Sequence, residues 1–336
     1  MTLEAYFDKI ESLKKETKKR TALLLGTTVK IEDSLFYTTP IRQTDDYIIG
    51  GIVYYDINAL DSKIDYIEQH FNTLFIDIEV KNRNFKDCRP WEVISEKFQN
   101  IRKIPYKSND LTVLSFRDYF NNLFFDTKKA IVIGAGNIGA KLAIHLVENG
   151  IQTYLFRRDV KRCEKIVEGI NATISEFSTG KAHLITDIDK EEGPFNLVVL
   201  CTPGIPVFGD EYFEKWHQPK YLVDIGKGCF ETEFLEKKIR SPLFRLDVSH
   251  QIEKMVDHYN FTYNHFSKSW IERALGEITV VPSGLLARKD EIIVDRVENA
   301  TQVYGISNGC GDLVRNLSDE QKLKIQAVIE FYGIKA

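Results

Sequence analysis

The chain has 336 residues, 43% hydrophobic and 28% charged, which is typical of an ordinary globular protein with room for two domains. The formal net charge of −4 supplies no basic field for nucleic acid, and no apolar run reaches the roughly 18–20 residues that span a bilayer. The five cysteines form no CxxC pair and the seven histidines form no HxxxH pattern, so we expect reduced thiols, no metal site and a cytoplasmic location.

Strand-like and helical stretches alternate in the first third of the chain. Residues 46–55 and 73–80 are rich in Ile, Val, Phe and Tyr and predict strands, and the stretch between them has helical spacing. Residues 89–102 and 110–125 predict helices. This alternation indicates a small sheet covered by helices, and we assign residues 1–122 to an N-terminal α/β domain.

From residue 128 the alternation becomes regular. Short apolar runs predict strands at residues 130–134, 153–158, 195–203 and 220–226, with helical patterns between them. Near-continuous apolar strands separated by helices indicate a parallel sheet that is buried on both faces. We therefore predict a Rossmann-type parallel-sheet domain over residues 123–305. Residues 306–336 predict a C-terminal helical segment that packs back on the N-terminal domain.

Three glycines mark the turn after the first of these strands. Gly134, Gly136 and Gly139 form a GxGxxG motif directly before a helix. The first allows a tight turn, the second leaves room for a pyrophosphate, and the third lets helix and strand pack closely. The helix N-terminus, with Asn137 and Ile138, offers free N–H groups and a partial positive charge to phosphates. We expect a dinucleotide here; the alternative is a Rossmann-type domain that has lost its ligand.

Two arginines end the next strand. Arg157 and Arg158 stand where an NAD-preferring domain has an acid that accepts hydrogen bonds from the ribose 2′-hydroxyl. A guanidinium instead pairs with the 2′-phosphate of NADP and can stack on adenine. Lys161 adds positive charge one turn on, and Asp159 is placed to cap the next helix. NADP(H) is therefore the expected cofactor and NAD(H) is less favoured; the alternative is a solvated basic loop that tolerates either one.

Two later loops lie at the same edge of the predicted sheet, where ligands bind. Thr202 and Pro203 follow one strand and are expected beside the nicotinamide half of the cofactor, and Gly226 ends the next strand. Cys201 is expected to be a small packed residue rather than a nucleophile, because no neighbour in the sequence activates it.

The chain resembles the superfamily of shikimate dehydrogenases and methylenetetrahydrofolate dehydrogenases, in which an amino-acid-dehydrogenase-like domain precedes an NADP-type Rossmann domain. Shikimate dehydrogenases carry a lysine after a strand and an Asn-Thr-Asp segment before the Rossmann unit. Here Lys81 follows the strand in FIDIEVK, and Asn109 and Asp110 lie in KSNDLT, where the segment is shortened to Asn-Asp. The run NLVVLCTPGIP is similar to the family's cofactor loop. The resemblance covers roughly residues 71–230 and identifies no specific family.

The resemblance implies that Lys81 and Asp110 face each other in a cleft near the nicotinamide C4. The ammonium would donate a hydrogen bond to a substrate oxygen as hydride arrives or leaves, and the carboxylate would orient the lysine. Lys107 and Asn109 are expected to contact the substrate. The alternative is that Lys81 is an exposed charge at a strand end and Asp110 only caps a helix.

These features predict an NADP(H)-dependent oxidoreductase that transfers a hydride to or from a carbinol or amine carbon of a small polar biosynthetic metabolite. The alternatives are a Rossmann-based lyase or cyclodeaminase that uses the nicotinamide transiently, and a non-catalytic NADP-binding protein. The expected partners are a small-molecule substrate and a second copy of the chain, since homodimers are the commonest oligomers, and neither nucleic acid nor a membrane.

Overall fold

A computed structural model of the chain describes residues 2–27, 36–81, 89–237, 239–269 and 273–334. The chain divides into two compact units, Met1–Lys254 and Met255–Ala336. Among the described residues, no helix is both long enough and apolar enough to cross a membrane.

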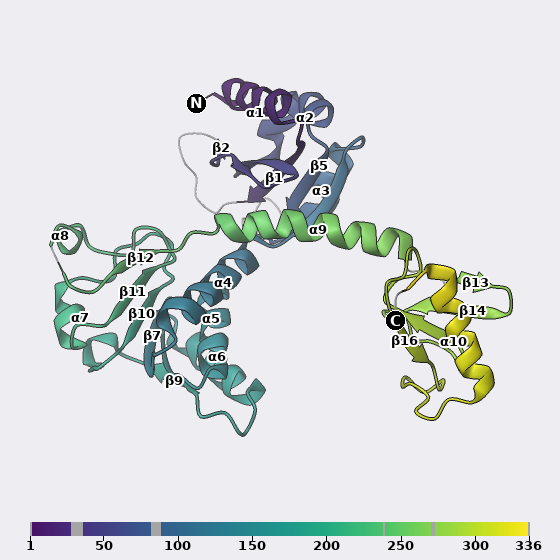
Figure 1. The fold of residues 1–336 in the computed structure, drawn as a ribbon. Helices are drawn as coiled ribbons and strands as arrows, with labels where there is room; N and C mark the ends of the chain where they lie inside the picture. Colours follow the sequence, from purple (N-terminus) through teal and green to yellow (C-terminus); the bar gives the residue numbers. More distant parts are fainter. Residues whose placement is uncertain (1, 28–35, 82–88, 238, 270–272, 335–336) are drawn as a thin grey trace. The chain divides into compact units, whose positions relative to one another are not determined.

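The N-terminal part of the larger unit is built on a mainly parallel sheet with the strand order β2-β4-β1-β5-β6 and with β3 beside β4. Its strands are β1 (Arg20–Thr27), β2 (Phe36–Thr38), β3 (Arg42–Gln43), β4 (Tyr47–Tyr54), β5 (Thr73–Asp77) and β6 (Arg102–Tyr106). The helices beside them are α1 (Leu3–Thr17), the 3-10 helix η1 (Ile57–Lys63), α2 (Ile64–His70) and α3 (Pro90–Lys97) (Figure 1).

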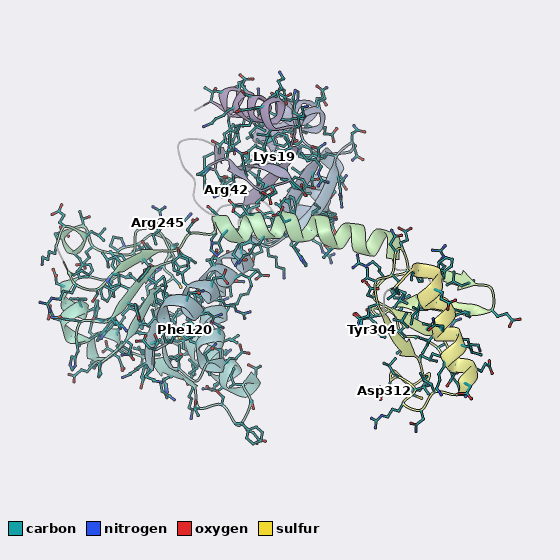
Figure 2. All side chains as sticks on the ribbon, viewed as in Figure 1. Lys19, Arg42, Phe120, Arg245, Tyr304 and Asp312 are labelled. Carbon is teal, nitrogen blue, oxygen red and sulfur yellow. The ribbon has the colours of Figure 1, made fainter. Side chains whose placement is uncertain are left out.

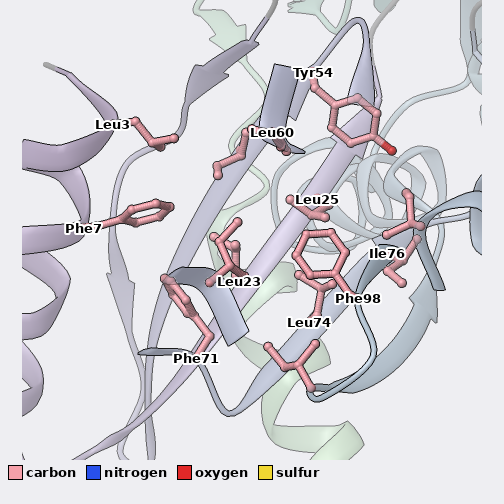
Figure 3. Close-up of a cluster of buried hydrophobic side chains, with 14 of the residues drawn as sticks. Leu3, Phe7, Leu23, Leu25, Tyr54, Leu60, Phe71, Leu74, Ile76 and Phe98 are labelled. Atoms are coloured by element: carbon pink, nitrogen blue, oxygen red, sulfur yellow. The ribbon is translucent and has the colours of Figure 1, made fainter. Parts of the chain in front are cut away.

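Strand β1 shows how the sequence positions this sheet. Leu23 and Leu25 belong to a core that also contains Phe7 of α1, which turns toward β1 in Figure 3. Leu24 and Gly26 point the other way, because successive residues of a strand alternate between its faces, and both line a cavity. Burying each leucine stabilises the fold by roughly 2 kcal/mol. The apolar face thus fixes the sheet, and the opposite face lines the cavity.

The second sheet has the strand order β12-β11-β10-β7-β8-β9, and every pair in it is parallel. The strands are β7 (Lys129–Ile133), β8 (Gln152–Phe156), β9 (Lys181–Ile185), β10 (Leu197–Leu200), β11 (Tyr221–Asp224) and β12 (Leu243–Arg245). Counted from β7, this is the order 6-5-4-1-2-3 of the Rossmann fold. The predicted α/β class, with a small α/β domain before a Rossmann sheet, is confirmed.

The helices that accompany the Rossmann sheet include α4 (Ser108–Tyr119), the π-helical turn η3 (Phe120–Phe124), α5 (Asn137–Glu148), α6 (Val160–Thr173), η4 (Ile188–Lys190), α7 (Asp210–Lys215) and α8 (Thr232–Leu235). Phe116 and Phe120 of α4 and η3 share a core with Leu142 and Leu146 of α5. This apolar contact ties the C-terminal end of α4 and the turn η3 to the helix that follows the glycine motif.

The smaller unit is a mixed sheet, β13-β14-β15-β16, covered by α10. Its elements are β13 (Arg273–Leu275), β14 (Ile278–Pro282), β15 (Ile292–Val294), β16 (Val303–Ile306) and α10 (Asp319–Tyr332), and α9 (Ser249–Ser269) precedes them. Residues predicted as one Rossmann domain, 123–305, therefore divide between two sheets. Val328 of α10 is buried with Val280 and Ile292, so the helical segment predicted within residues 306–336 completes this second core. Its packing on the N-terminal domain stays a prediction.

Candidate active site

The glycine motif forms a tight loop between β7 and α5. Gly134 has φ +98°, and a Cβ there would lie 2.8 Å from the backbone carbon of Cys201. A Cβ at Gly139 would overlap the Gly134 carbonyl oxygen, so helix and strand touch directly. At Gly136, by contrast, no atom lies within 4 Å of the Cβ position. The first and third glycines are thus required by packing, and the second faces open space.

That open space lies at the N-terminus of α5. Gly136 is the N-cap residue and provides no side-chain cap, so the first-turn N–H groups are available to a ligand. Asn137 is exposed, whereas Ile138 packs against the core of the sheet. Backbone N–H groups and the positive end of the helix dipole favour an anion here.

A cavity of about 680 Å³ opens beside this loop, and we call it the Rossmann cavity. It is lined by Ile133, Gly134, Gly136, Phe156, Arg157, Arg158, Asp159, Ile188, Cys201, Thr202, Pro203, Ile205, Val207, Tyr212 and Glu231. Arg157 is half-buried, and its Nη1 donates to the Ala135 carbonyl at 3.0 Å; Arg158 is exposed. Asp159 accepts from the Arg162 N–H at 3.1 Å and caps α6, as predicted. Lys161 is exposed and is not among the lining residues.

Thr202 and Gly226 make a close contact beyond the glycine loop. A Cβ at Gly226 would overlap the Thr202 carbonyl oxygen and would lie 2.6 Å from Cys229 Sγ. Gly226 does not line the Rossmann cavity, so the structure gives it a packing role where the sequence predicted cofactor contact. Burial raises the pKa of the Cys201 thiol, in keeping with a packed residue rather than a nucleophile.

A second cavity, of about 550 Å³, lies within the larger unit, and we call it the hydroxyl-rich cavity. Hydroxyl side chains that line it are Thr27, Tyr37, Thr38, Thr39, Tyr106, Ser108 and Thr112. Its charged lining residues are Arg42, Lys227, Arg245 and Asp247 (Arg42 and Arg245 are labelled in Figure 2). Arg42 Nε donates to Ser249 Oγ at 3.0 Å. Burial, with Asp77 nearby, raises the pKa of Tyr106 and keeps its hydroxyl a neutral donor.

Lys81 belongs to a buried polar cluster rather than to an exposed strand end. Its Nζ lies 2.5 Å from Asp77 Oδ2 and 3.7 Å from Glu79 Oε2, and it also donates to Ser108 Oγ. The Ser108 hydroxyl donates to Asp77 Oδ2 at 2.8 Å. Asp77 is fully buried and 18% of the Lys81 side chain is exposed, so Lys81 balances a charge that water cannot reach.

Asp110 has a different partner. Its carboxylate pairs with Lys141 of α5, so the expected Lys81–Asp110 pair is replaced by Lys81–Asp77 and Asp110–Lys141. The reason is helical geometry: residues two apart on a helix do not share a face, so Ser108 meets the strand end and Asp110 turns toward α5. Neither Lys81 nor Asp110 lines the hydroxyl-rich cavity, although Ser108 does.

The two predicted substrate residues lie at the start of α4. Lys107 is its exposed N-cap residue and makes no side-chain cap, while the Asn109 N–H donates to Glu79 Oε2 at 2.9 Å.

Sequence reasoning missed Asp77, Tyr106 and Ser108. Asp77 carried a signal, because an acid inside the apolar run TLFIDIEV must find a partner if that run is buried.

No family model matches the chain, and no curated protein has a significantly similar sequence. Among solved structures it is similar to quinate dehydrogenase from Corynebacterium glutamicum in complex with NAD, at 16% identity over 73% of this chain and 94% of that one, with a TM-score of 0.43. It is also similar to shikimate dehydrogenase in complex with NADP+, at 13% identity over 71% and 90% of the two chains, with a TM-score of 0.39. A third is 5-ketofructose reductase of Gluconobacter sp., at 13% identity over 72% and 92%, with a TM-score of 0.39.

One of the three is itself called a shikimate dehydrogenase, the group that the sequence motifs resemble.

Proposed function

We propose that the chain is an oxidoreductase that holds NADP(H) in the Rossmann cavity and exchanges a hydride with a carbinol or amine carbon of a small polar metabolite. The observation that carries the proposal is the open space at Gly136, at the uncapped N-terminus of α5, in a cavity that Arg157 and Arg158 also line. A pyrophosphate fits the open space at the N-terminus of α5, and a 2′-phosphate fits the two arginines. When bound, the dinucleotide supplies or accepts the hydride at its nicotinamide ring.

The two arginines have different tasks in this proposal. Arg157 already uses Nη1 to hold the Ala135 carbonyl, which fixes the guanidinium beside the glycine loop, where its flat face can stack on adenine. Arg158 is exposed on the same cavity and is the residue that pairs with the 2′-phosphate.

The substrate occupies the hydroxyl-rich cavity. Ile225 and Lys227 line that cavity and flank Gly226, which touches Thr202 on the wall of the Rossmann cavity. A molecule there therefore lies beside the end of the dinucleotide that reaches Thr202. The abundance of hydroxyl side chains favours a small polar molecule over an apolar one.

Ser108 is the proton donor to the substrate in this arrangement. Ser108 lines the cavity, and its hydroxyl accepts a hydrogen bond from Lys81, whose charge is balanced by buried Asp77. As charge develops on a substrate oxygen, the Ser108 Oγ–H leaves Asp77 Oδ2, to which it donates at 2.8 Å, moves its proton to that oxygen and recovers one from Lys81 Nζ. Lys81 thus acts through Ser108, and Asp77 keeps it in place.

Nucleotide titration tests the proposal. We expect NADPH to bind wild-type protein at least tenfold more tightly than NADH, about 1.4 kcal/mol, and Arg158→Ala to remove most of that margin. The matched control is Arg162→Ala, an exposed arginine of α6 that does not line the cavity and leaves both affinities unchanged. Equal affinity for the two nucleotides would refute the 2′-phosphate assignment. Binding of neither would overturn the proposed function.

Turnover distinguishes the predicted alternatives. Loss of NADPH absorbance with a panel of small carbonyl metabolites is the expected result. Product formation without net consumption of NADPH would indicate a lyase or cyclodeaminase, and tight NADPH binding without turnover would indicate a non-catalytic protein.

A further inference from the structure

The Rossmann cavity contains a carboxylate that the phosphates of a dinucleotide would repel. Glu231 lines this cavity together with Arg157 and Arg158. A carboxylate accepts hydrogen bonds and donates none, so its favourable partners on a dinucleotide are neutral donors such as ribose hydroxyls. We propose that Glu231 binds the hydroxyls of the nicotinamide-side ribose; this inference rests on the proposed function.

The strand order places Glu231 away from the arginines. Along the sheet the neighbours run β8-β7-β10-β11. Arg157 and Arg158 follow β8, the glycine loop follows β7, Thr202 follows β10 and Glu231 comes after β11. A dinucleotide lies across this edge with its pyrophosphate at the reversal of strand order, here between β7 and β10. With its 2′-phosphate on the β8 side, its other ribose extends toward β10 and β11.

The backbone around Glu231 is held in place. Phe208 and Phe230 form a parallel bridge between the loops after β10 and β11, and the Glu231 N–H donates to the Phe208 carbonyl at 2.9 Å. The carboxylate lies against Gly209, where a Cβ would overlap Glu231 Oε2. Gly209 thus leaves the room that the carboxylate occupies.

The carboxylate itself has no structural task that the described part of the chain reveals. Within that part, no ion pair or side-chain hydrogen bond joins Glu231 to another residue, and α8 begins after it without a side-chain cap. Its two oxygens match the two donors of a ribose diol, and hydrogen bonds to a charged acceptor are stronger than those between neutral groups.

Two ligands distinguish contacts to the nicotinamide half of the dinucleotide from contacts to its adenosine half. NADPH contains the nicotinamide ribose, whereas 2′,5′-ADP contains only the adenosine half with its 2′-phosphate. By isothermal titration calorimetry we expect Glu231→Ala to weaken NADPH binding about tenfold and to leave 2′,5′-ADP binding unchanged. Glu231→Gln keeps one acceptor oxygen and is expected to fall between wild type and Glu231→Ala. Glu233→Gln, an exposed neighbour outside the cavity lining, is the charge-matched control and changes neither affinity.

Other outcomes overturn the inference. If Glu231→Ala weakens both ligands equally, or neither, the carboxylate does not contact the nicotinamide ribose. If it tightens both, Glu231 only repels the phosphates. Arg158→Ala gives the converse pattern, weakening both ligands, and thermal unfolding of each variant shows that it is folded. If neither ligand binds the wild-type protein, the proposed function fails and the inference fails with it.

Discussion

Gly226 and Thr202 are in such close contact that a Cβ at residue 226 would overlap the Thr202 carbonyl oxygen. Thr202 lines the Rossmann cavity, and the residues that flank Gly226, Ile225 and Lys227, line the hydroxyl-rich cavity. The contact is therefore a wall shared by the two cavities. Any side chain at residue 226 must displace the backbone of Thr202 or of residue 226 itself.

Gly226→Ala tests this shared wall. Forcing a methyl group into packed backbone is expected to cost about 1–3 kcal/mol of unfolding free energy and to weaken NADPH binding, because the Thr202 loop must move. Gly169→Ala is the matched control: it lies exposed in α6 with no atom within 4 Å of the Cβ position, and it is expected to stabilise by up to about 1 kcal/mol. Urea unfolding measures both, and a Gly226→Ala protein as stable as wild type would contradict the overlap.

Gly136→Ala separates binding from stability. A methyl group at residue 136 meets open space, and φ is −91°, so the free energy of unfolding should stay within about 0.5 kcal/mol of wild type. The same methyl group would occupy the expected pyrophosphate position, and we expect NADPH affinity to fall at least tenfold. Gly139→Ala should instead destabilise the fold, because its Cβ would overlap the Gly134 carbonyl. Unchanged NADPH affinity in Gly136→Ala would place the pyrophosphate elsewhere.

Ser108→Ala tests the proton transfer. It removes the hydroxyl between Lys81 and the cavity and keeps the Lys81–Asp77 pair, so we expect kcat to fall about 100-fold with NADPH affinity unchanged. The measurement is steady-state reduction followed by NADPH absorbance across pH, with Ser175→Ala, in an exposed turn, as the control. Lys81→Met is a less specific test. It leaves the buried Asp77 carboxylate without its ion-pair partner, which is expected to destabilise the fold by about 3–5 kcal/mol. Wild-type kcat in Ser108→Ala would exclude it as the proton donor.

Asp110→Asn tests the pairing that the family resemblance implies. The Asp110 and Lys141 side chains are 45% and 35% exposed, and an exposed ion pair is worth less than about 1 kcal/mol. We therefore expect less than a twofold change in kcat and a small change in stability, and Lys141→Met should match it in unfolding experiments. A 100-fold loss of kcat in Asp110→Asn without loss of stability would show that Asp110 acts on the substrate and that Ser108 is not sufficient.

The sequence predicted best those features that local chemistry determines. The turn between β7 and α5 follows from Gly134 and Gly139. Neither position has room for a Cβ, and their spacing in the sequence predicted this. The cap at Asp159 follows in the same way from residues close in the chain. Strand β6 was missed because RKIPY carries two charges and a proline, and its strand character comes from pairing with β5.

The candidate substrate site was harder to predict because it depends on contacts far apart in the sequence. Lys81 lies 27 residues from Ser108, and only the parallel pairing of β5 with β6 brings them together. A motif that reads Asn-Asp also draws attention to Asp110, although the side chain that meets Lys81 is Ser108. The smaller unit went unrecognised because its strands have only three to five residues and pair in a mixed sheet.

His145 gives the fold a dependence on pH. It lies in α5, where its ring packs edge-on against Phe120 at 5.2 Å between centroids and against Phe116 at 6.5 Å. Burial, with repulsion from Arg117, lowers the His145 pKa from 6.5 to about 4. Between these two values the unfolded chain binds a proton that the folded chain does not. The free energy of unfolding is therefore at its full value above pH 6.5 and decreases as the pH falls from 6.5 toward 4. Below pH 4 the folded histidine is also protonated, and His145 causes no further decrease.

At pH 5.0 these pKa values correspond to a loss of about 2 kcal/mol relative to pH 7.5 from His145 alone. We expect His145→Leu, which keeps an apolar side chain among the phenylalanines, to lose that much less stability between the two pH values. Urea unfolding of both proteins at pH 7.5 and 5.0 measures the difference. The pKa of His183 is also lowered by burial, but this group is common to both proteins and cancels. An identical pH dependence in the two proteins would contradict the lowered pKa, because it would mean that His145 has the same pKa in the folded and the unfolded chain.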